Sequence, residues 1–133
     1  MAGSGWTDPR PLSPHLQVWR FHMTMLASII HRATGVAMYF GAFLITAWIV
    51  ALASGPEAYA IADVIINHFL AQLVLFAWAV AVMFHLANGI RYLFWDGPKI
   101  GFDPNIASLI SIVNFGFSVV AAGAIYAYAV IAT

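Results

Sequence analysis

Three long apolar stretches are the feature that most restricts how this chain can fold. They run over 33–53, roughly 69–90 and 106–132. Each reaches the length of about 20 residues that a helix needs to cross about 30 Å of hydrocarbon. Because lipid cannot hydrogen-bond open backbone groups, spans of this kind are predicted to be α-helices. We therefore expect an all-α membrane protein with three transmembrane helices.

Polar and helix-breaking residues set the expected ends of the spans. Gly55 and Pro56 end the first one. The second is expected over about 64–95, with Asp63 as its cap and its first turns at the membrane interface, and Pro98 follows its end. These boundaries leave one short loop on each side of the membrane.

The whole chain, 1–133, is expected to form one membrane-anchor domain, with a cytoplasmic or interfacial segment over 1–32. That segment holds three arginines and no continuous apolar core, so its pattern does not match that of a cleavable signal peptide. It also lacks the Arg/Ser-rich composition of an organellar transit peptide. The pattern therefore favours a bacterial protein.

All five basic residues fall on one side of the expected spans: Arg10, Arg20, Arg32, Arg91 and Lys99. The loop between the first two spans instead carries Glu57 and Asp63. Since cytoplasmic loops are enriched in Lys and Arg, the N-terminus and the second loop are expected to face the cytoplasm. The expected location is the bacterial inner (cytoplasmic) membrane.

Composition excludes several function classes. The chain is 63% hydrophobic and 8% charged, and its five basic residues balance five acidic ones. Without a basic patch, no nucleic-acid partner is expected. Without cysteine, the chain can supply no disulfide, thiolate ligand or Fe–S ligand, so a metal would need His, carboxylate or Met.

One candidate site lies on the second span around His85. Helical spacing puts His85, Asn88, Gly89, Tyr92 and Asp96 on one face. An ionisable residue inside a membrane span is a functional candidate, and the missing side chain at Gly89 would leave room for a flat macrocycle beside an imidazole that can bind haem iron. The alternative is a histidine bonded to a neighbouring helix, with the glycine permitting close packing.

A second candidate site lies at the entrance to the first span. Ser28 and Arg32 are four residues apart on one helix face, with His31 and Gly35 beside them. A hydroxyl and a guanidinium could hold a quinone carbonyl or a carboxylate such as a haem propionate. The alternative is an interfacial Arg32 that serves only as an orientation signal.

Three ordered motifs resemble the cytochrome b membrane-anchor subunits of the succinate dehydrogenase family, respiratory complex II. The motifs are RPLSPHL at 10–16, SIIHRATG at 28–35 and HLANGIRYLFWD at 85–96. The likeness covers nearly the whole chain. One departure is Tyr92, where many members of the family carry His, which bears on contacts at the haem edge rather than on the axial ligand.

The resemblance implies a role for each of these residues. His85 would be an axial ligand of haem b, Ser28 and Arg32 would help form the ubiquinone site, and His31 and Arg32 would lie near the haem propionates. A second small membrane anchor would bundle with this chain and supply the other axial His. Asp96 is a candidate for the proton path, with capping of the next loop as the other interpretation.

The resemblance also implies an iron–sulfur subunit and a flavoprotein subunit on the cytoplasmic side, which would hold the Fe–S clusters and FAD. This chain would anchor them, bind haem and help reduce ubiquinone as the non-flavin subunit of a succinate:quinone oxidoreductase. Three alternatives stay open. They are a fumarate reductase anchor, a self-contained cytochrome with His31 and His85 as both ligands, and a non-catalytic assembly subunit or transporter component.

Overall fold

The computed structural model describes residues 19–132, and within that range the regular structure is entirely helical. The helices are α1 (Met23–Ala53), α2 (Pro56–Ile66), α3 (Phe69–Asp96) and α4 (Pro104–Ala132). Three of them, α1, α3 and α4, are long and apolar enough to cross a membrane. The all-α architecture with three candidate spans is therefore confirmed.

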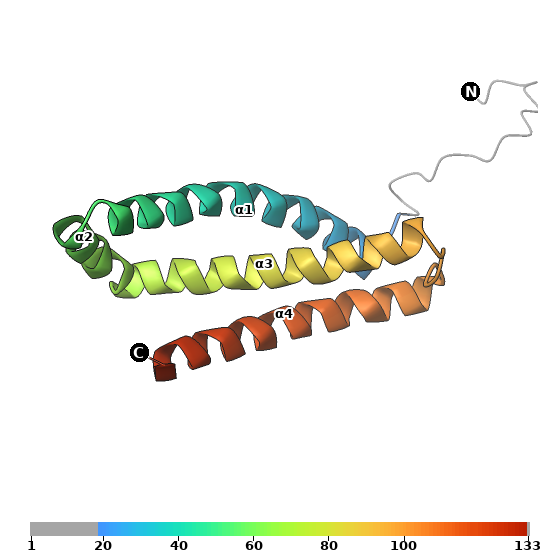
Figure 1. Ribbon diagram of the computed structural model, residues 1–133. Coiled ribbons are helices and arrows are strands. Elements are labelled where there is room, and N and C mark those ends of the chain that lie inside the picture. The colour runs from blue at the N-terminus through green and yellow to red at the C-terminus, as the bar shows by residue number, and fades with distance from the viewer. Residues whose placement is uncertain (1–18, 133) are drawn as a thin grey trace, which may run out of the picture.

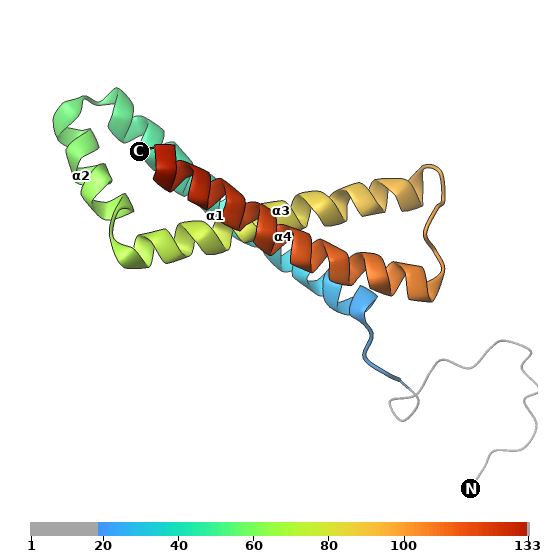
Figure 2. The same cartoon turned by 90° about the horizontal axis from the view of Figure 1, so that it is seen from below.

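The three long helices run antiparallel to their neighbours in sequence, with α3 between α1 and α4 (Figure 1). Seen from below, α1 and α3 cross (Figure 2). The short helix α2 joins α1 to α3 at the same end of the bundle as the end of α4 (Figure 1). The start of α1 and the loop between α3 and α4 lie at the opposite end, so segments far apart in sequence meet there.

This arrangement separates the charges along the bundle. The described basic residues all belong to the end where α1 begins and α3 finishes: Arg20, Arg32, Arg91 and Lys99. Glu57 and Asp63 lie in α2 at the other end. Arg10 is outside the described residues. A single basic end is the distribution that the positive-inside rule requires of a cytoplasmic face.

Helix α1 begins earlier than the expected first span. It starts at Met23 rather than near residue 33, and His22 caps it because its Nδ1 accepts the backbone N–H of Met25 at 3.2 Å. Ser28 and Arg32 therefore lie inside a regular helix. That regular geometry fixes the spacing of their side chains.

The expected helix over 64–95 is divided in two, and Asp63 is not its cap. Asp63 lies within α2, while α3 starts at Phe69 with His68 as its N-cap, its Nδ1 accepting the backbone N–H of Leu70. The Gln72 side-chain amide donates to the Ile66 carbonyl at 2.8 Å, which satisfies a free carbonyl at the end of α2. The far end of α3, at Asp96, agrees with the sequence.

The bundle is apolar outside and partly polar inside. Large hydrophobic side chains cover much of its surface, whereas the buried positions include Asn88, Arg91, Ser111 and Ser118 beside small residues such as Ala27. A water-soluble protein would bury its apolar residues instead. This distribution fits helices whose outer faces contact lipid or another membrane chain and whose contacts use small and polar residues.

Candidate functional site

Two segments of the same pattern, His-x-x-x-Gly, meet where α1 passes α3. They are His31–Gly35 in α1 and His85–Gly89 in α3. The two imidazole rings stack, with centroids 3.9 Å apart and planes 14° apart. The histidines that the sequence assigned to separate sites therefore form one pair.

The two glycines differ in how much space the opposite histidine needs. A Cβ on Gly35 would lie 3.2 Å from Cε1 of His85, which is a tight contact, whereas a Cβ on Gly89 would lie 3.9 Å from Cε1 of His31, an ordinary van der Waals distance. The space that Gly89 was expected to leave for a flat group is lined by an imidazole of this chain. The close contact of the two helices therefore depends on Gly35, and not on Gly89 as the packing alternative supposed.

Hydrogen bonds fix the tautomer of His85. Its Nδ1 lies 3.1 Å from the backbone carbonyl of His31 and 3.2 Å from the Thr34 hydroxyl, which itself donates to that carbonyl at 2.9 Å. Since a carbonyl can only accept, Nδ1 carries the proton and Nε2 keeps its lone pair. No hydrogen bond to Nε2 occurs within residues 19–132.

A second set of contacts continues from the histidine pair toward the basic end. The rings of Tyr92 and His31 make a T-shaped contact, with centroids 5.1 Å apart and planes 76° apart. The Arg91 guanidinium lies 5.2 Å from the Tyr92 centroid and 4.4 Å from that of Trp95. Arg91 is only 5% exposed and donates to the Ser111 hydroxyl in α4. These contacts tie the histidine pair to α4.

Several polar atoms around this cluster are buried without a partner in the described part of the chain. They include both amide atoms of Asn88, Nδ1 of His31 and Nε of Arg91. Asn88 shares the polar face that the sequence predicted, but it is fully buried and offers nothing to a ligand outside. It is therefore an interior residue of the helix contact.

Ser28 and Arg32 lie side by side on α1, as the spacing predicted. Nη2 of Arg32 donates to the Ser28 hydroxyl at 3.3 Å, and its Nε donates to the Ser28 carbonyl at 3.4 Å. Arg32 is exposed and its other N–H groups point to no described acceptor. The pair is a set of donors open to a molecule outside this chain, and it has no described hydrogen bond to His85.

Asp96 belongs to a different surface. It is exposed at the end of α3 and lines a hollow of about 450 Å³ with Tyr92, Leu93, Trp95 and Phe102. Within the described residues it makes no ion pair or hydrogen bond with Ser28 or Arg32. Asp96 therefore belongs to the same stretch of α3 as Tyr92 and is separate from the Ser28/Arg32 pair.

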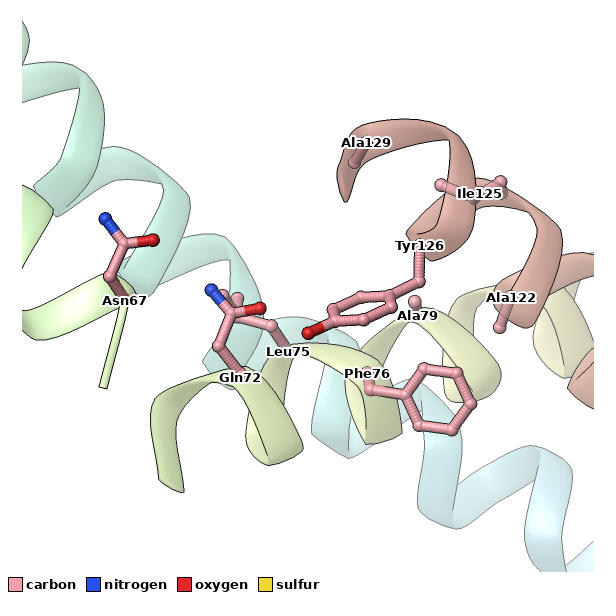
Figure 3. A pocket seen from close by; sticks show the side chains of 9 residues that line it. All are labelled: Asn67, Gln72, Leu75, Phe76, Ala79, Ala122, Ile125, Tyr126 and Ala129. Atoms are coloured by element: carbon pink, nitrogen blue, oxygen red, sulfur yellow. The ribbon is translucent and has the colours of Figure 1, made fainter. Parts of the chain in front are cut away.

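A second open hollow, also of about 450 Å³, lies between α3 and α4 near the opposite end. Figure 3 shows the Tyr126 hydroxyl directed toward Leu75 and Gln72, with the Phe76 ring below the ring of Tyr126. None of the residues that the sequence singled out as a site lines this hollow. The candidate site is therefore the helix contact near the basic end.

Haem iron needs only one or two axial protein ligands rather than a cluster of them, and no group of three metal-binding side chains occurs in residues 19–132. The residues present fit one axial position. His85 has its Nδ1 held by a carbonyl, as metal-binding histidines commonly do, and its Nε2 is unbonded. His31 would instead be a neighbour of that ligand.

The stacked pair does not fit a haem held by both histidines. Iron–nitrogen bonds of about 2 Å on each side put the centroids of two axial imidazoles about 6 Å apart, with the macrocycle between them. The centroids here are 3.9 Å apart with the ring faces in contact. This geometry argues against the self-contained cytochrome.

Thr34 is the residue of this site that sequence reasoning missed, together with the pairing of the two histidines. A usable signal was present, because HRATG at 31–35 and HLANG at 85–89 share the pattern His-x-Ala-x-Gly. In a helix, residues four positions apart lie on one face, so this pattern places a histidine ring beside a glycine without a side chain. When two such helices pack antiparallel, the histidine of each can lie opposite the glycine of the other.

Comparison with known proteins identifies the family of the chain. The profile of the succinate dehydrogenase/fumarate reductase transmembrane subunit family matches residues 7–125. The succinate dehydrogenase cytochrome b556 subunit of Paracoccus denitrificans is 44% identical over 87 residues, which cover 65% of this chain and 67% of that protein. The b556 subunit of Rickettsia felis is 36% identical over 89 residues, covering 67% and 68%.

The human mitochondrial cytochrome b560 subunit is 35% identical over 89 residues, covering 65% of this chain and 53% of that protein. The chain belongs to the succinate dehydrogenase/fumarate reductase transmembrane subunit family. Within that family, these relatives support the cytochrome b membrane anchor of complex II, the membrane subunit of an oxidoreductase, as the three motifs implied.

Proposed function

We propose that this chain binds haem b through His85 and helps form the ubiquinone reduction site of a succinate dehydrogenase. The observation that carries the proposal is the Nδ1 bond of His85 to the His31 carbonyl, which leaves Nε2 as a free ligand on a rigid helix contact. The second axial His comes from the partner anchor subunit. Bound haem supplies one-electron chemistry between the two anchors.

Ser28 and Arg32 are the proposed quinone donors. The Ser28 hydroxyl already orients the guanidinium, which leaves further N–H groups for a quinone oxygen. Negative charge that develops on this oxygen during reduction would be stabilised by donors already in place at a site of low dielectric constant. Protons come from the cytoplasmic side, with Asp96 as the candidate carrier. His31 and Arg32 would also lie near the haem propionates.

The electrons come from partner subunits in this proposal. This chain has no cysteine for an Fe–S cluster, so an iron–sulfur subunit and a flavoprotein subunit with FAD would oxidise succinate. They would dock at the basic end of the bundle, on the cytoplasmic side of a bacterial inner membrane. The physiological direction proposed is succinate oxidation rather than fumarate reduction.

Purification of the chain with its partner subunits gives the direct test. A reduced-minus-oxidised spectrum is expected to show b-type haem bands, and the complex is expected to reduce a ubiquinone analogue with succinate as donor. A complex without these bands after haem supplementation would rule out the cytochrome function. Bands without quinone reduction would rule out only the quinone site.

Replacement of Arg32 by Leu tests the quinone site. R32L is expected to lower the rate of succinate-dependent quinone reduction about ten- to a hundredfold, since a hydrogen bond from a charged donor contributes about 1.5–3 kcal/mol. Haem content should stay near that of the wild type. Arg20, an exposed arginine ahead of α1, provides the matched control R20L. Equal rates in the two variants would leave Arg32 as an orientation signal only.

Replacement of Thr34 by Val tests the support of the haem ligand. Val keeps the shape but removes the hydroxyl that contacts Nδ1 of His85. Loss of such a supporting bond commonly weakens metal binding about 10- to 100-fold, so T34V is expected to lose haem faster in a competition with apomyoglobin. Thr46, whose hydroxyl bonds only the Ala42 carbonyl of its own helix, gives the control T46V. Equal loss rates would contradict the role of Thr34.

A further inference from the structure

Tyr92 holds a position from which it can control the histidine pair. It lies seven residues, or two helical turns, after His85 on the same face of α3, with Gly89 between them. The His31 ring of α1 lies beside Gly89, within ordinary van der Waals distance of the place where a Cβ would be. His31 stacks on His85 and makes a T-shaped contact with the Tyr92 ring. His31 therefore contacts two rings of one helix.

Tyr92 is itself held in place. Arg91 lies against its ring at 5.2 Å and against Trp95 at 4.4 Å, and the rings of Tyr92 and Trp95 meet at 5.7 Å. The Arg91 guanidinium donates to Ser111 across the contact with α4. Arg91 has no carboxylate partner within residues 19–132, so this buried cation depends on such donors and ring faces, and moving it would be costly.

The Tyr92 hydroxyl has no described hydrogen bond, so the ring is the part that makes the contacts. Removing the ring would free one side of His31. The His31 carbonyl accepts the hydrogen bond from Nδ1 of His85, and the His31 ring stacks on the His85 ring. A displacement of His31 would therefore alter the plane of the His85 imidazole.

We propose that Tyr92 is a positioning residue: its ring holds the His31 imidazole against His85 and so fixes the plane of the proposed haem ligand. The inference rests on the proposed function for its haem readouts. It assigns a role to Tyr92, a position at which the third sequence motif departs from the pattern of many family members. The contact between Tyr92 and His31 is a packing contact, so it affects the orientation of the proposed haem ligand and not the number of haem ligands.

The test compares Y92L with Y92F and Y92H in the purified complex. In low-spin haem proteins the orientation of axial imidazoles affects the electron paramagnetic resonance g values and the midpoint potential. Y92L is expected to keep the b-type bands but shift both quantities, whereas Y92F should match the wild type. Y92H, with a smaller ring, should lie between them. Tyr59 in α2, at the other end of the bundle, gives the control Y59L.

A histidine-labelled complex gives a readout that does not need haem. The nuclear magnetic resonance signals of the His31 ring should shift in Y92L and stay in place in Y92F, with H31A identifying them. Unchanged g values, potential and ring signals in Y92L would overturn the inference and leave haem binding by His85 intact. A shift in Y92F as large as in Y92L would also overturn it, because the hydroxyl would then be responsible. A wild-type complex without haem would instead overturn the proposed function, and the ring signals would still decide the contact.

Discussion

Replacement of His85 by Ala is expected to abolish the b-type bands of the purified complex, because among residues 19–132 it removes the histidine whose geometry fits an axial ligand. Its Nδ1 is occupied by the His31 carbonyl, and its Nε2 is the atom left for iron. The measurement is a reduced-minus-oxidised spectrum together with haem content per complex. Retention of normal bis-His bands in H85A would contradict the assignment.

The matched variant is H31A. If the second ligand comes from the partner anchor, H31A should keep six-coordinate b-type haem, although its midpoint potential should change with the loss of the stacked ring. A self-contained cytochrome predicts the opposite, with H31A losing the bis-His spectrum. The two variants together therefore separate a ligand from its neighbour.

The spans could be predicted from sequence because their cause is local. About 20 successive apolar residues need a helix in lipid whatever the rest of the chain does. The division between α2 and α3 was missed because no glycine or proline marks it. Polar caps at Asn67 and His68 end one helix and start the next, and such caps are weak signals within an otherwise helical pattern.

Only part of the site was predicted from the sequence, and the physical reason differs from the one that applies to the helices. The Ser28/Arg32 pair follows from helical spacing alone, and the structure has it. The contact between His31 and His85 joins residues 54 positions apart, so it depends on how α1 and α3 cross. A glycine four residues after a histidine indicated a gap, but sequence spacing does not say which group fills it.

Replacement of Gly41 by Ala is expected to destabilise the bundle more than a methyl group added at another glycine of these helices. A Cβ at Gly41 would overlap the Trp78 indole at Nε1 and Cε2. The indole would have to leave its place between α1 and α3. Overpacking of this kind costs about 1–3 kcal/mol. We therefore expect G41A to lower the unfolding temperature of the detergent-solubilised complex and its yield.

Two further variants show whether the indole is the cause. G116A adds a methyl group on α4 where no side chain and no other helix of the described residues lies within 4 Å, so it should leave the unfolding temperature close to that of the wild type. W78A removes the obstructing ring, and the double variant G41A/W78A should then lose less stability than the sum of the two single changes. If instead G41A is as stable as G116A, or the two losses simply add, close contact at Gly41 does not set the distance between α1 and α3. That distance also determines whether His31 can reach His85, so a fall in haem retention in G41A that W78A restores would connect this packing contact to the site.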